Sequence, residues 1–294
     1  MIRSTAITIC FLILSFIPLP LHSADETFFA QVRLEVEKAL KGRQGVALWI
    51  DRETHERRLW GDAAVAEEFF RPGSLMKLVV AEAALRKGEN PLYECRGHDR
   101  FADGKFFCWK RSGHGLLDLP KALSASCNLY FANLSARVGA EEIVDSLKRY
   151  GFSRAALLKP SRFSPRKLRF LAIGDSPEFH VTPAEIADFW DHYLTHLDDP
   201  ALSAVKQGLS RASSEGTASE KGGKSLEILA KTGTSDSERG TYRTHGWFLG
   251  AAPAEKPRFA LIVFLKDAYG FREAAELGRK IFSHLQLQSS QNSP

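Results

Sequence analysis

The central segment of this chain is Arg71-Pro72-Gly73-Ser74-Leu75-Met76-Lys77-Leu78-Val79-Val80-Ala81. Its proline and glycine predict a turn, and the apolar run that follows continues to Leu85. Two basic residues and then Gly88 end the run, as is typical of a helix C-terminus. Because a helix that is apolar on nearly all sides belongs in the interior of a protein, we predict a central buried helix with Ser74 at its N-terminal end.

Ser74 and Lys77 are three residues apart, so both side chains lie on one face of this helix. A serine hydroxyl is a weak nucleophile until a neighbouring base takes its proton, and burial lowers the pKa of a lysine enough for it to act as that base. The helix N-terminus also offers backbone N–H groups to a developing negative charge. The alternative is a surface helix with a capping serine, but the apolar neighbours of Lys77 favour the reactive pair.

Size and charge indicate an ordinary globular protein. The 294 residues suffice for one large domain or two small ones with a sizeable core. The formal charge of +5 is small, and no cluster of lysine and arginine suggests a nucleic-acid-binding face. We therefore expect no nucleic-acid partner.

The N-terminal residues have the pattern of a secretory signal peptide. Arg3 precedes an apolar stretch from Ala6 to Leu21, and the small residues Ser23 and Ala24 follow His22 at the expected cleavage site. Two prolines within this stretch disfavour a membrane-spanning helix. We predict that residues 1–24 are a cleaved signal and that the protein is exported to the periplasm or the extracellular face. An uncleaved membrane anchor is the alternative.

The cysteines beyond the signal allow two interpretations. In an exported protein Cys95 and Cys108 could form a disulfide that closes a short loop, which would leave Cys127 as a buried thiol. Alternatively, Cys95, His98, Cys108 and His114 could supply four zinc ligands. The spacing of the second pair is loose for a zinc site, and export favours the disulfide.

The order of the predicted elements indicates an α+β fold. The predicted strands are residues 46–51, 57–60, 228–234, 245–252 and 258–266, and the main predicted helices are residues 27–40, 74–86, 116–138, 140–150, 183–187 and 272–287. Residues 89–115, 158–168 and 210–225 are predicted to be loops. Strands at both ends of the chain predict an antiparallel sheet built from the two ends and flanked by helices, with a helical subdomain inserted.

Two further polar clusters follow the Ser74 segment. Ser126-Cys127-Asn128 lies in a predicted helix, where its serine and asparagine share a face only if the turn is distorted. Lys231-Thr232-Gly233-Thr234-Ser235 ends a predicted strand. There the glycine allows close approach of another backbone, and the lysine and hydroxyl groups suit a carboxylate. Taken singly, each cluster is also consistent with polar residues of a helix or turn that have no function.

Together and in this order, the three clusters resemble the S-x-x-K, S-x-N and K-T-G signatures of the penicillin-recognising serine acyl-transferases, which include penicillin-binding proteins and serine β-lactamases. Flanking segments similar to the transpeptidase branch are Gly113-His114-Gly115, Val181-Thr182-Pro183-Ala184-Glu185-Ile186-Ala187, Glu215-Gly216-Thr217-Ala218 and His245-Gly246-Trp247-Phe248-Leu249-Gly250. The resemblance covers residues 45–287 and implies a penicillin-binding transpeptidase-like domain over residues 25–290.

The resemblance also implies roles for the motif residues. Those expected to carry catalysis are Ser74, Lys77, Ser126 and Lys231, and those expected to bind substrate are Asn128, Thr232, Gly233 and Thr234. Ser74 would attack a peptide carbonyl after Lys77 takes its proton, and Ser126 would relay that proton to the leaving amine. Positive charge on Lys231 would help to keep Lys77 neutral. Backbone N–H groups of Ser74 and Thr234 would form the oxyanion hole. The resemblance implies neither a metal nor an organic cofactor.

The function that the resemblance implies is a DD-transpeptidase or DD-carboxypeptidase acting on D-Ala-D-Ala stem peptides of peptidoglycan. β-Lactams would be inhibitors or substrates, and cell-wall synthesis proteins are expected partners. The alternatives are a class D-like serine β-lactamase, with Lys77 free or carboxylated, and a non-catalytic sensor of cell-wall fragments or β-lactams. The class D branch usually has S-x-V where this chain has Ser126-Cys127-Asn128, and the chain lacks the E-x-x-L-N element of class A enzymes. No large N-terminal pedestal is expected, since about twenty residues separate the predicted signal from the first predicted strand.

Overall fold

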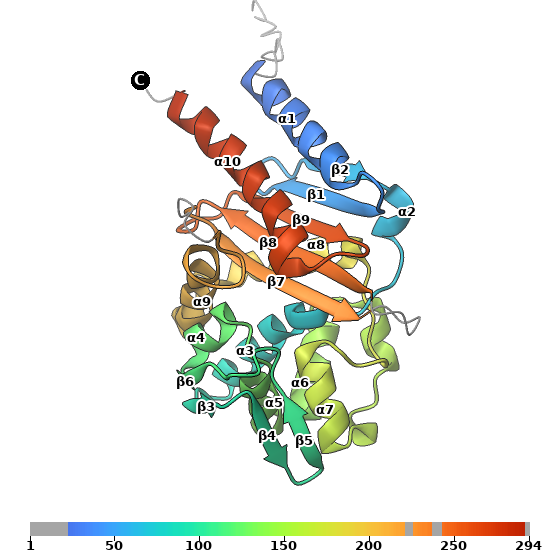
Figure 1. Ribbon diagram of the computed structural model, residues 1–294, viewed down its shortest axis with the longest axis vertical. Helices are drawn as coiled ribbons and strands as arrows, with labels where there is room; N and C mark the ends of the chain where they lie inside the picture. The colour runs from blue at the N-terminus through green and yellow to red at the C-terminus, as the bar shows by residue number, and fades with distance from the viewer. Residues whose placement is uncertain (1–22, 221–225, 237–242, 292–294) are drawn as a thin grey trace, which may run out of the picture.

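The computed structural model of the chain describes residues 23–220, 226–236 and 243–291 (Figure 1). The described residues contain a five-stranded antiparallel sheet in the order β2-β1-β9-β8-β7. Its strands are β1 (Gly45–Asp51), β2 (Arg57–Gly61), β7 (Leu229–Asp236), β8 (Thr244–Ala252) and β9 (Phe259–Leu265). The predicted α+β sheet, with strands from both ends of the chain, is confirmed, including the β1–β2 pair and the β8–β9 hairpin.

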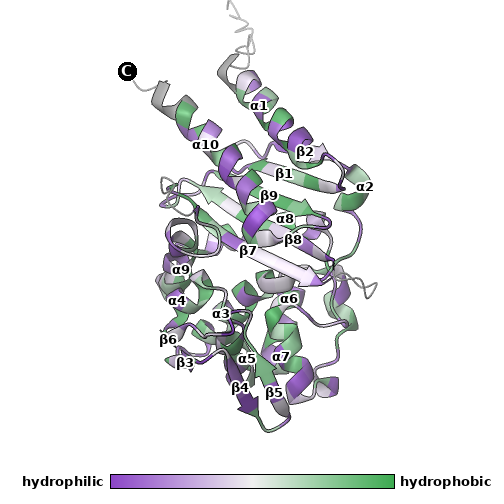
Figure 2. Ribbon diagram, viewed as in Figure 1, coloured by the Kyte–Doolittle hydropathy of each residue, from purple (hydrophilic) through white to green (hydrophobic). Residues whose placement is uncertain are grey.

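Helices cover both faces of this sheet. On one face α1 (Ser23–Ala39) and α10 (Ala275–Gln291) lie side by side, and the first described helix and the last one therefore share a layer (Figure 1). They bury Phe28, Val32 and Phe282 against Trp49 and Phe248 of the sheet. On the other face α8 (Pro183–His196) packs against β1 and β9. Figure 2 shows that the central strands are apolar, as burial on both faces requires.

The inserted helical region lies beyond strand β7, and its centre is the predicted buried helix. A 3₁₀ turn, Gly73–Leu75, leads into α3 (Met76–Arg86), which is buried along most of its length. The remaining helices are α2 (Ala63–Ala66), α4 (Leu119–Ser124), α5 (Asn128–Val138), α6 (Ala140–Arg149), α7 (Pro165–Ile173) and α9 (Ser203–Ser214). The 3₁₀ turn packs on β7, so the N-terminal end of α3 faces the edge strand of the sheet.

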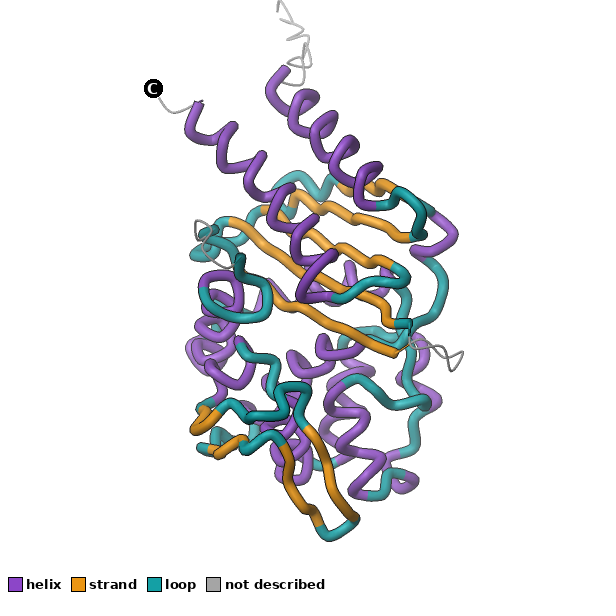
Figure 3. Tube along the Cα trace, viewed as in Figure 1, coloured by secondary structure: helices purple, strands orange, loops and turns teal. Residues whose placement is uncertain are grey.

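Residues 89–115 are not the continuous loop that we predicted. They contain β3 (Tyr93–Cys95), β4 (His98–Phe101) and β5 (Gly104–Phe107), and β6 (Gly115–Leu117) follows (Figure 3). β3 pairs with β6 and β4 with β5, each pair antiparallel. These strands have three or four residues each, which is too short for an alternating pattern to emerge from the sequence. We call residues 93–117 the small-strand lobe.

The single helix predicted over residues 116–138 is also wrong, because the structure breaks it. Asp118 caps α4 by accepting a hydrogen bond from the Lys121 backbone N–H, and Pro120 follows in its first turn, as predicted. α4 ends at Ser124, and α5 begins at Asn128. Between them Ser126 has a φ of +50°, which a non-glycine residue rarely adopts. The distorted turn that we regarded as a condition for bringing Ser126 and Asn128 together is therefore present.

Helices α7 and α9 occupy segments that we predicted to be partly loop. Ser164 caps α7, Pro165 is in its first turn, and Gly174 ends it in the left-handed conformation. The cap and stop residues of α7 are present in the sequence, but the basic residues between them obscure the apolar pattern of a helix.

The predicted signal peptide lies almost wholly outside the described residues, as do residues 221–225 of the predicted loop. Within the described residues no helix has both the length and the apolar character needed to cross a membrane.

Candidate active site

The three motifs, far apart in the sequence, meet where the sheet edge faces the helical region. Ser74 lies in the 3₁₀ turn before α3, and Lys77 lies in the first turn of that helix. Ser126 and Asn128 lie at the break between α4 and α5. Lys231 projects from β7, the edge strand next to that turn.

The amine of Lys77 is at the centre of this site. Its side chain is fully buried. Nζ donates hydrogen bonds to Ser74 Oγ at 3.0 Å, Ser126 Oγ at 3.2 Å and the Ser126 carbonyl oxygen at 2.7 Å. It also lies 2.6 Å from Asn128 Oδ1, so the carboxamide oxygen faces the amine and the NH₂ group is left to other partners. The distance from Ser74 Oγ is within the range that proton transfer to a general base requires.

Ser126 is held by contacts on both its hydroxyl and its carbonyl group. Its Oγ accepts a hydrogen bond from Lys231 Nζ at 3.0 Å in addition to the one from Lys77. Its carbonyl oxygen accepts a hydrogen bond from Trp109 Nε1 at 3.1 Å. These contacts stabilise the strained backbone of Ser126, whose cost would otherwise be about 1–3 kcal/mol. The serine hydroxyl is thereby placed between two amines, through which a proton can pass.

The two lysines share a buried environment that disfavours charge. Burial lowers the pKa of Lys77 to about 8. Burial, and then the positive charge of Lys77, lower the pKa of Lys231 well below its ordinary value. Because repulsion between like charges is mutual, a proton on either amine disfavours a proton on the other. The pair as a whole therefore resists carrying two positive charges, which leaves one amine available to accept a proton.

Strand β7 approaches the 3₁₀ turn very closely at Gly233. A Cβ atom added to this residue would lie 3.1 Å from the carbonyl oxygen of Pro72 and 3.2 Å from Leu75 Cγ. A larger residue would push the strand away from the turn that carries Ser74. The glycine of the third motif therefore sets the distance between the nucleophile and the sheet edge, as its predicted role of close backbone approach requires.

The threonines of the third motif have partners that the sequence analysis did not identify. Thr232 Oγ1 donates a hydrogen bond to Thr217 Oγ1 at 2.7 Å, and Thr234 Oγ1 accepts one from the Gly270 backbone N–H at 3.0 Å. Because Thr234 uses its oxygen as an acceptor, its own proton remains for a carboxylate. Thr217 was quoted only as part of a similar flanking segment, whereas Trp109 and Gly270 had no signal in their local sequence.

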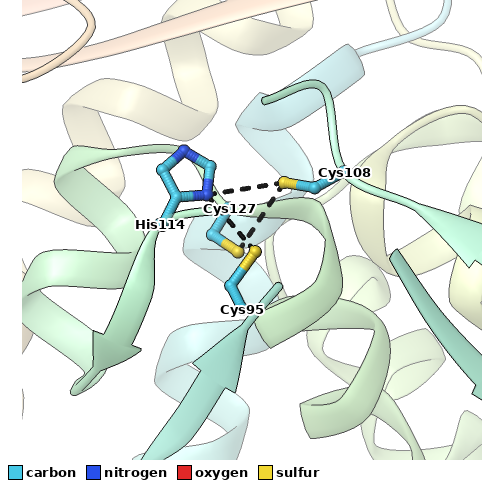
Figure 4. A group of neighbouring side chains, drawn as sticks. All are labelled: Cys95, Cys108, His114 and Cys127. Carbon is cyan, nitrogen blue, oxygen red and sulfur yellow. Dashed lines mark hydrogen bonds between the residues drawn. The ribbon is translucent and has the colours of Figure 1, made fainter. Parts of the chain in front are cut away.

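The structure contradicts the predicted disulfide. Cys95, Cys108 and Cys127, the cysteines within the described residues, are all free thiols and all buried. The alternative set of zinc ligands is wrong in one member, because His98 is exposed on β4 whereas Cys127 lies beside Cys108. Cys95, Cys108, His114 and Cys127 form one cluster, which we call the Cys₃His cluster (Figure 4).

Comparison with known proteins places the chain in a family. The family model described as "Penicillin binding protein transpeptidase domain" matches residues 50–192 and 195–283. Stage V sporulation protein D of Bacillus subtilis is 24% identical over 252 residues, which are 68% of this chain and 39% of that protein. Peptidoglycan D,D-transpeptidase MrdA of Acinetobacter baumannii is 23% identical over 253 residues, which are 64% of this chain and 37% of that protein.

Among solved structures, the transpeptidase domain of Burkholderia pseudomallei penicillin-binding protein 3 superposes with a TM-score of 0.76 at 19% identity. The superposition covers 92% of this chain and 96% of that one, which shows the shared fold. The chain spans less than two fifths of the length of the two curated relatives. Since the family model matches most of the sequence, this chain belongs to the penicillin-binding protein transpeptidase domain family.

Proposed function

We propose that this protein is a serine acyl-transferase that acts on D-Ala-D-Ala stem peptides of peptidoglycan, as a DD-transpeptidase or DD-carboxypeptidase. The observation that carries the proposal is the 3.0 Å hydrogen bond between Lys77 Nζ and Ser74 Oγ in a fully buried environment. A neutral lysine at that distance can take the serine proton and so produce a nucleophile for acyl transfer.

The proposed reaction has two acyl-transfer steps. Ser74 Oγ forms a bond to the carbonyl carbon of the penultimate D-alanine as Lys77 accepts its proton, and the peptide bond to the terminal D-alanine then breaks. Ser126 delivers a proton to the leaving amine, and the hydrogen bonds from Lys77 and Lys231 to Ser126 Oγ provide the path. An acceptor amine or water then attacks the ester and releases Ser74. The acceptor decides between cross-linking and hydrolysis.

The remaining motif residues are proposed to bind the substrate. The NH₂ group of Asn128 would donate to a backbone carbonyl of the stem peptide, since its oxygen faces Lys77. Thr234 would bind the terminal carboxylate with its hydroxyl proton, and Thr232 would do so after giving up its hydrogen bond to Thr217. Gly233 keeps the strand close to Ser74. Backbone N–H groups of Ser74 and Thr234 would form the oxyanion hole, where the loss of one donor costs about 10²–10³ in rate.

A class D-like β-lactamase is the second candidate. Its carboxylated lysine would need room and hydrogen-bond donors around Nζ. The Nζ atom of Lys77 is instead surrounded by oxygen atoms of Ser74, Ser126 and Asn128 at 2.6–3.2 Å. This environment suits an unmodified amine and supports the peptidase. A sensor module without catalysis would keep the same site but release no product.

Export to the periplasm or the extracellular face is part of this proposal, because peptidoglycan stem peptides are cross-linked outside the membrane. The proposal includes removal of residues 1–24, which leaves nearly all of α1 in the mature chain. N-terminal sequencing of the exported protein should begin at Asp25. Partners among cell-wall synthesis proteins remain a prediction.

The experiment that tests the proposed function is release of D-alanine from a stem pentapeptide, with and without an acceptor amine. We expect release that depends on Ser74 and is absent from Ser74→Ala. A cross-linked product with the acceptor would identify a transpeptidase, and hydrolysis alone a carboxypeptidase. Binding of the pentapeptide by the folded protein without any release would refute the enzymatic proposal and leave the sensor.

A further inference from the structure

The Cys₃His cluster brings together four side chains from the ends of four different elements. Cys95 ends β3, Cys108 follows β5, His114 precedes β6, and Cys127 precedes the first residue of α5. Their Sγ and Nδ1 atoms all lie within 4.8 Å of one another. Figure 4 shows the four side chains pointing toward one common centre. All three cysteines have at most 1% of their surface exposed.

Three of the six distances between ligand atoms in the cluster match those of a tetrahedral zinc site, and the other three are no longer than 4.8 Å. Zinc holds sulfur at about 2.3 Å and nitrogen at about 2.0–2.1 Å, so tetrahedral ligands lie about 3.8 Å apart for two sulfurs and about 3.5–3.6 Å for sulfur and nitrogen. In this structure Cys108 Sγ lies 3.8 Å from Cys127 Sγ. His114 Nδ1 lies 3.5 Å from Cys95 Sγ and 3.6 Å from Cys108 Sγ. A disulfide would need about 2.05 Å between its sulfurs.

The backbone around the cluster is built to bring these ligands together. Gly97 and Gly113 both have left-handed φ angles, +85° and +82°. A Cβ atom at Gly97 would lie 1.9 Å from the Arg111 carbonyl oxygen, and one at Gly113 would lie 2.2 Å from that of Cys95. Only glycine allows the two loops to cross this closely.

Backbone hydrogen bonds hold this crossing together. The His114 N–H donates to the Cys95 carbonyl oxygen, and the Cys108 N–H donates to that of Gly97, both at 2.9 Å. Each bond joins a residue that carries a ligand to the other loop. The ligand side chains are therefore anchored through their own backbone.

From this geometry we propose that Cys95, Cys108, His114 and Cys127 bind one structural zinc ion, which ties the small-strand lobe to the catalytic Ser126 motif. Soft thiolate ligands and a tetrahedral arrangement with one imidazole select zinc. Isolated two-stranded sheets are marginally stable in water, and the small-strand lobe is built from two of them. The ion supplies the cross-link that this lobe needs.

The imidazole is oriented by an aromatic neighbour. With Nδ1 on the metal, Nε2 of His114 carries the proton, and Nε2 is buried without a hydrogen-bond partner among the described residues. The ring is instead held edge-on by Trp109, with 5.2 Å between centroids. Trp109 follows the ligand Cys108 and donates to the Ser126 carbonyl oxygen.

The position of Cys127 makes this ion a positioning element for the site. Cys127 lies between Ser126 and Asn128, both of which contact Lys77. Loss of the ion removes the restraint on Cys127 and Trp109 together. The strained backbone of Ser126, which these two residues hold, then relaxes. This consequence for acylation rests on the proposed function, whereas the metal content does not.

The first test measures the metal directly on the full chain, purified without added metal and under reducing conditions. We expect about one zinc per chain by elemental mass spectrometry. After chelation, added Co²⁺ should give the visible d–d bands of a tetrahedral ion and a thiolate-to-cobalt charge-transfer band. Cys95→Ser and His114→Ala should lose both signals, while His98→Ala, which changes an exposed histidine of the same lobe, should keep them.

Folded wild-type protein that contains less than about a tenth of a zinc per chain and gives no cobalt spectrum would overturn the proposal. A disulfide between any two of the three cysteines, found by mass after alkylation, would also overturn it. Both results come from the wild-type chain, so they hold even if a variant fails to fold.

The second test separates the positioning role from the proposed function. Chelation should lower the rate constant for acylation by benzylpenicillin about 10-fold to 100-fold, with little effect on the initial noncovalent binding, and zinc should restore it. Equal rates with and without zinc would refute the positioning role alone. Zinc-loaded, folded protein that is never acylated would instead contradict the proposed function and leave the metal site standing.

Discussion

Lys77 combines two properties that are rarely found together in a lysine, complete burial and a set of hydrogen-bond partners made of oxygen atoms. Removing an ammonium from water is costly, so burial favours the neutral amine. The oxygens of Ser126 and Asn128 accept hydrogen bonds from the amine, and the pKa of about 8 that burial leaves makes protonation reversible near neutral pH. A base that gains and loses a proton in this range is suited to general catalysis.

The pH dependence of acylation should therefore report on Lys77. Its pKa of about 8 means that the neutral, reactive form increases as pH rises. The rate constant for acylation by a fluorescent penicillin should rise about tenfold per pH unit below this value and level off above it. A rate that is constant or falls between pH 6.5 and about 8 would contradict this role. Thermal melts at each pH provide the control for folding.

At the same scale, sequence reasoning identified the chemistry but not the local geometry that supports it. The spacing of Ser74 and Lys77, the apolar run around Lys77 and the two downstream clusters together predicted the reactive pair. The kink at Ser126 was not predictable, because it depends on Trp109, Lys77 and Lys231, which approach from three other segments. The place of Cys127 in the Cys₃His cluster was not predictable either, because it depends on side chains that approach from other segments.

At the scale of elements, helix ends were the most predictable feature. Thr182 and Glu185 form the predicted capping box at the start of α8, with bonds in both directions at 3.0 and 2.9 Å. The short strands of the small-strand lobe were not predictable, since their pairing depends on contacts between loops rather than on local pattern. The structure also divided one predicted helix into α4 and α5.

The capping box provides a stability prediction. Thr182→Ala leaves the Glu185 backbone N–H without its acceptor and should lower the free energy of unfolding by about 1 kcal/mol. Thr195→Ala, which changes an exposed threonine near the end of the same helix, should change it by less than about 0.5 kcal/mol. Urea denaturation measures both, and equal effects of the two substitutions would contradict the capping role.

At the scale of the whole molecule, the sheet separates two apolar cores. One lies under α1 and α10, and the other surrounds α3 and the active site. The motifs depend on the second core and on the edge strand β7, whereas the first core covers the opposite face of the sheet (Figure 1). Stability and catalysis can therefore be perturbed separately.

Phe282→Ala tests this separation. Phe282 is fully buried between α10 and the sheet, so its truncation should cost about 3–5 kcal/mol of stability. The rate of acylation per folded molecule should stay within about twofold of the wild type, because Phe282 belongs to the core remote from Ser74. Ser283→Ala, at the next position of the helix, is the matched control and should be nearly neutral. A tenfold loss of rate in folded Phe282→Ala protein would show that the two cores are coupled.

The measurement that tests the central claim most directly is the intact mass of the protein after addition of benzylpenicillin, followed over hours. A penicillin-binding acyl-transferase should gain the mass of one drug molecule, keep it, and carry it on Ser74. Ser74→Ala should gain nothing. Folded, monodisperse wild-type protein that never gains mass would contradict the account, and so would a transient adduct accompanied by hydrolysed drug, which is the behaviour of a β-lactamase.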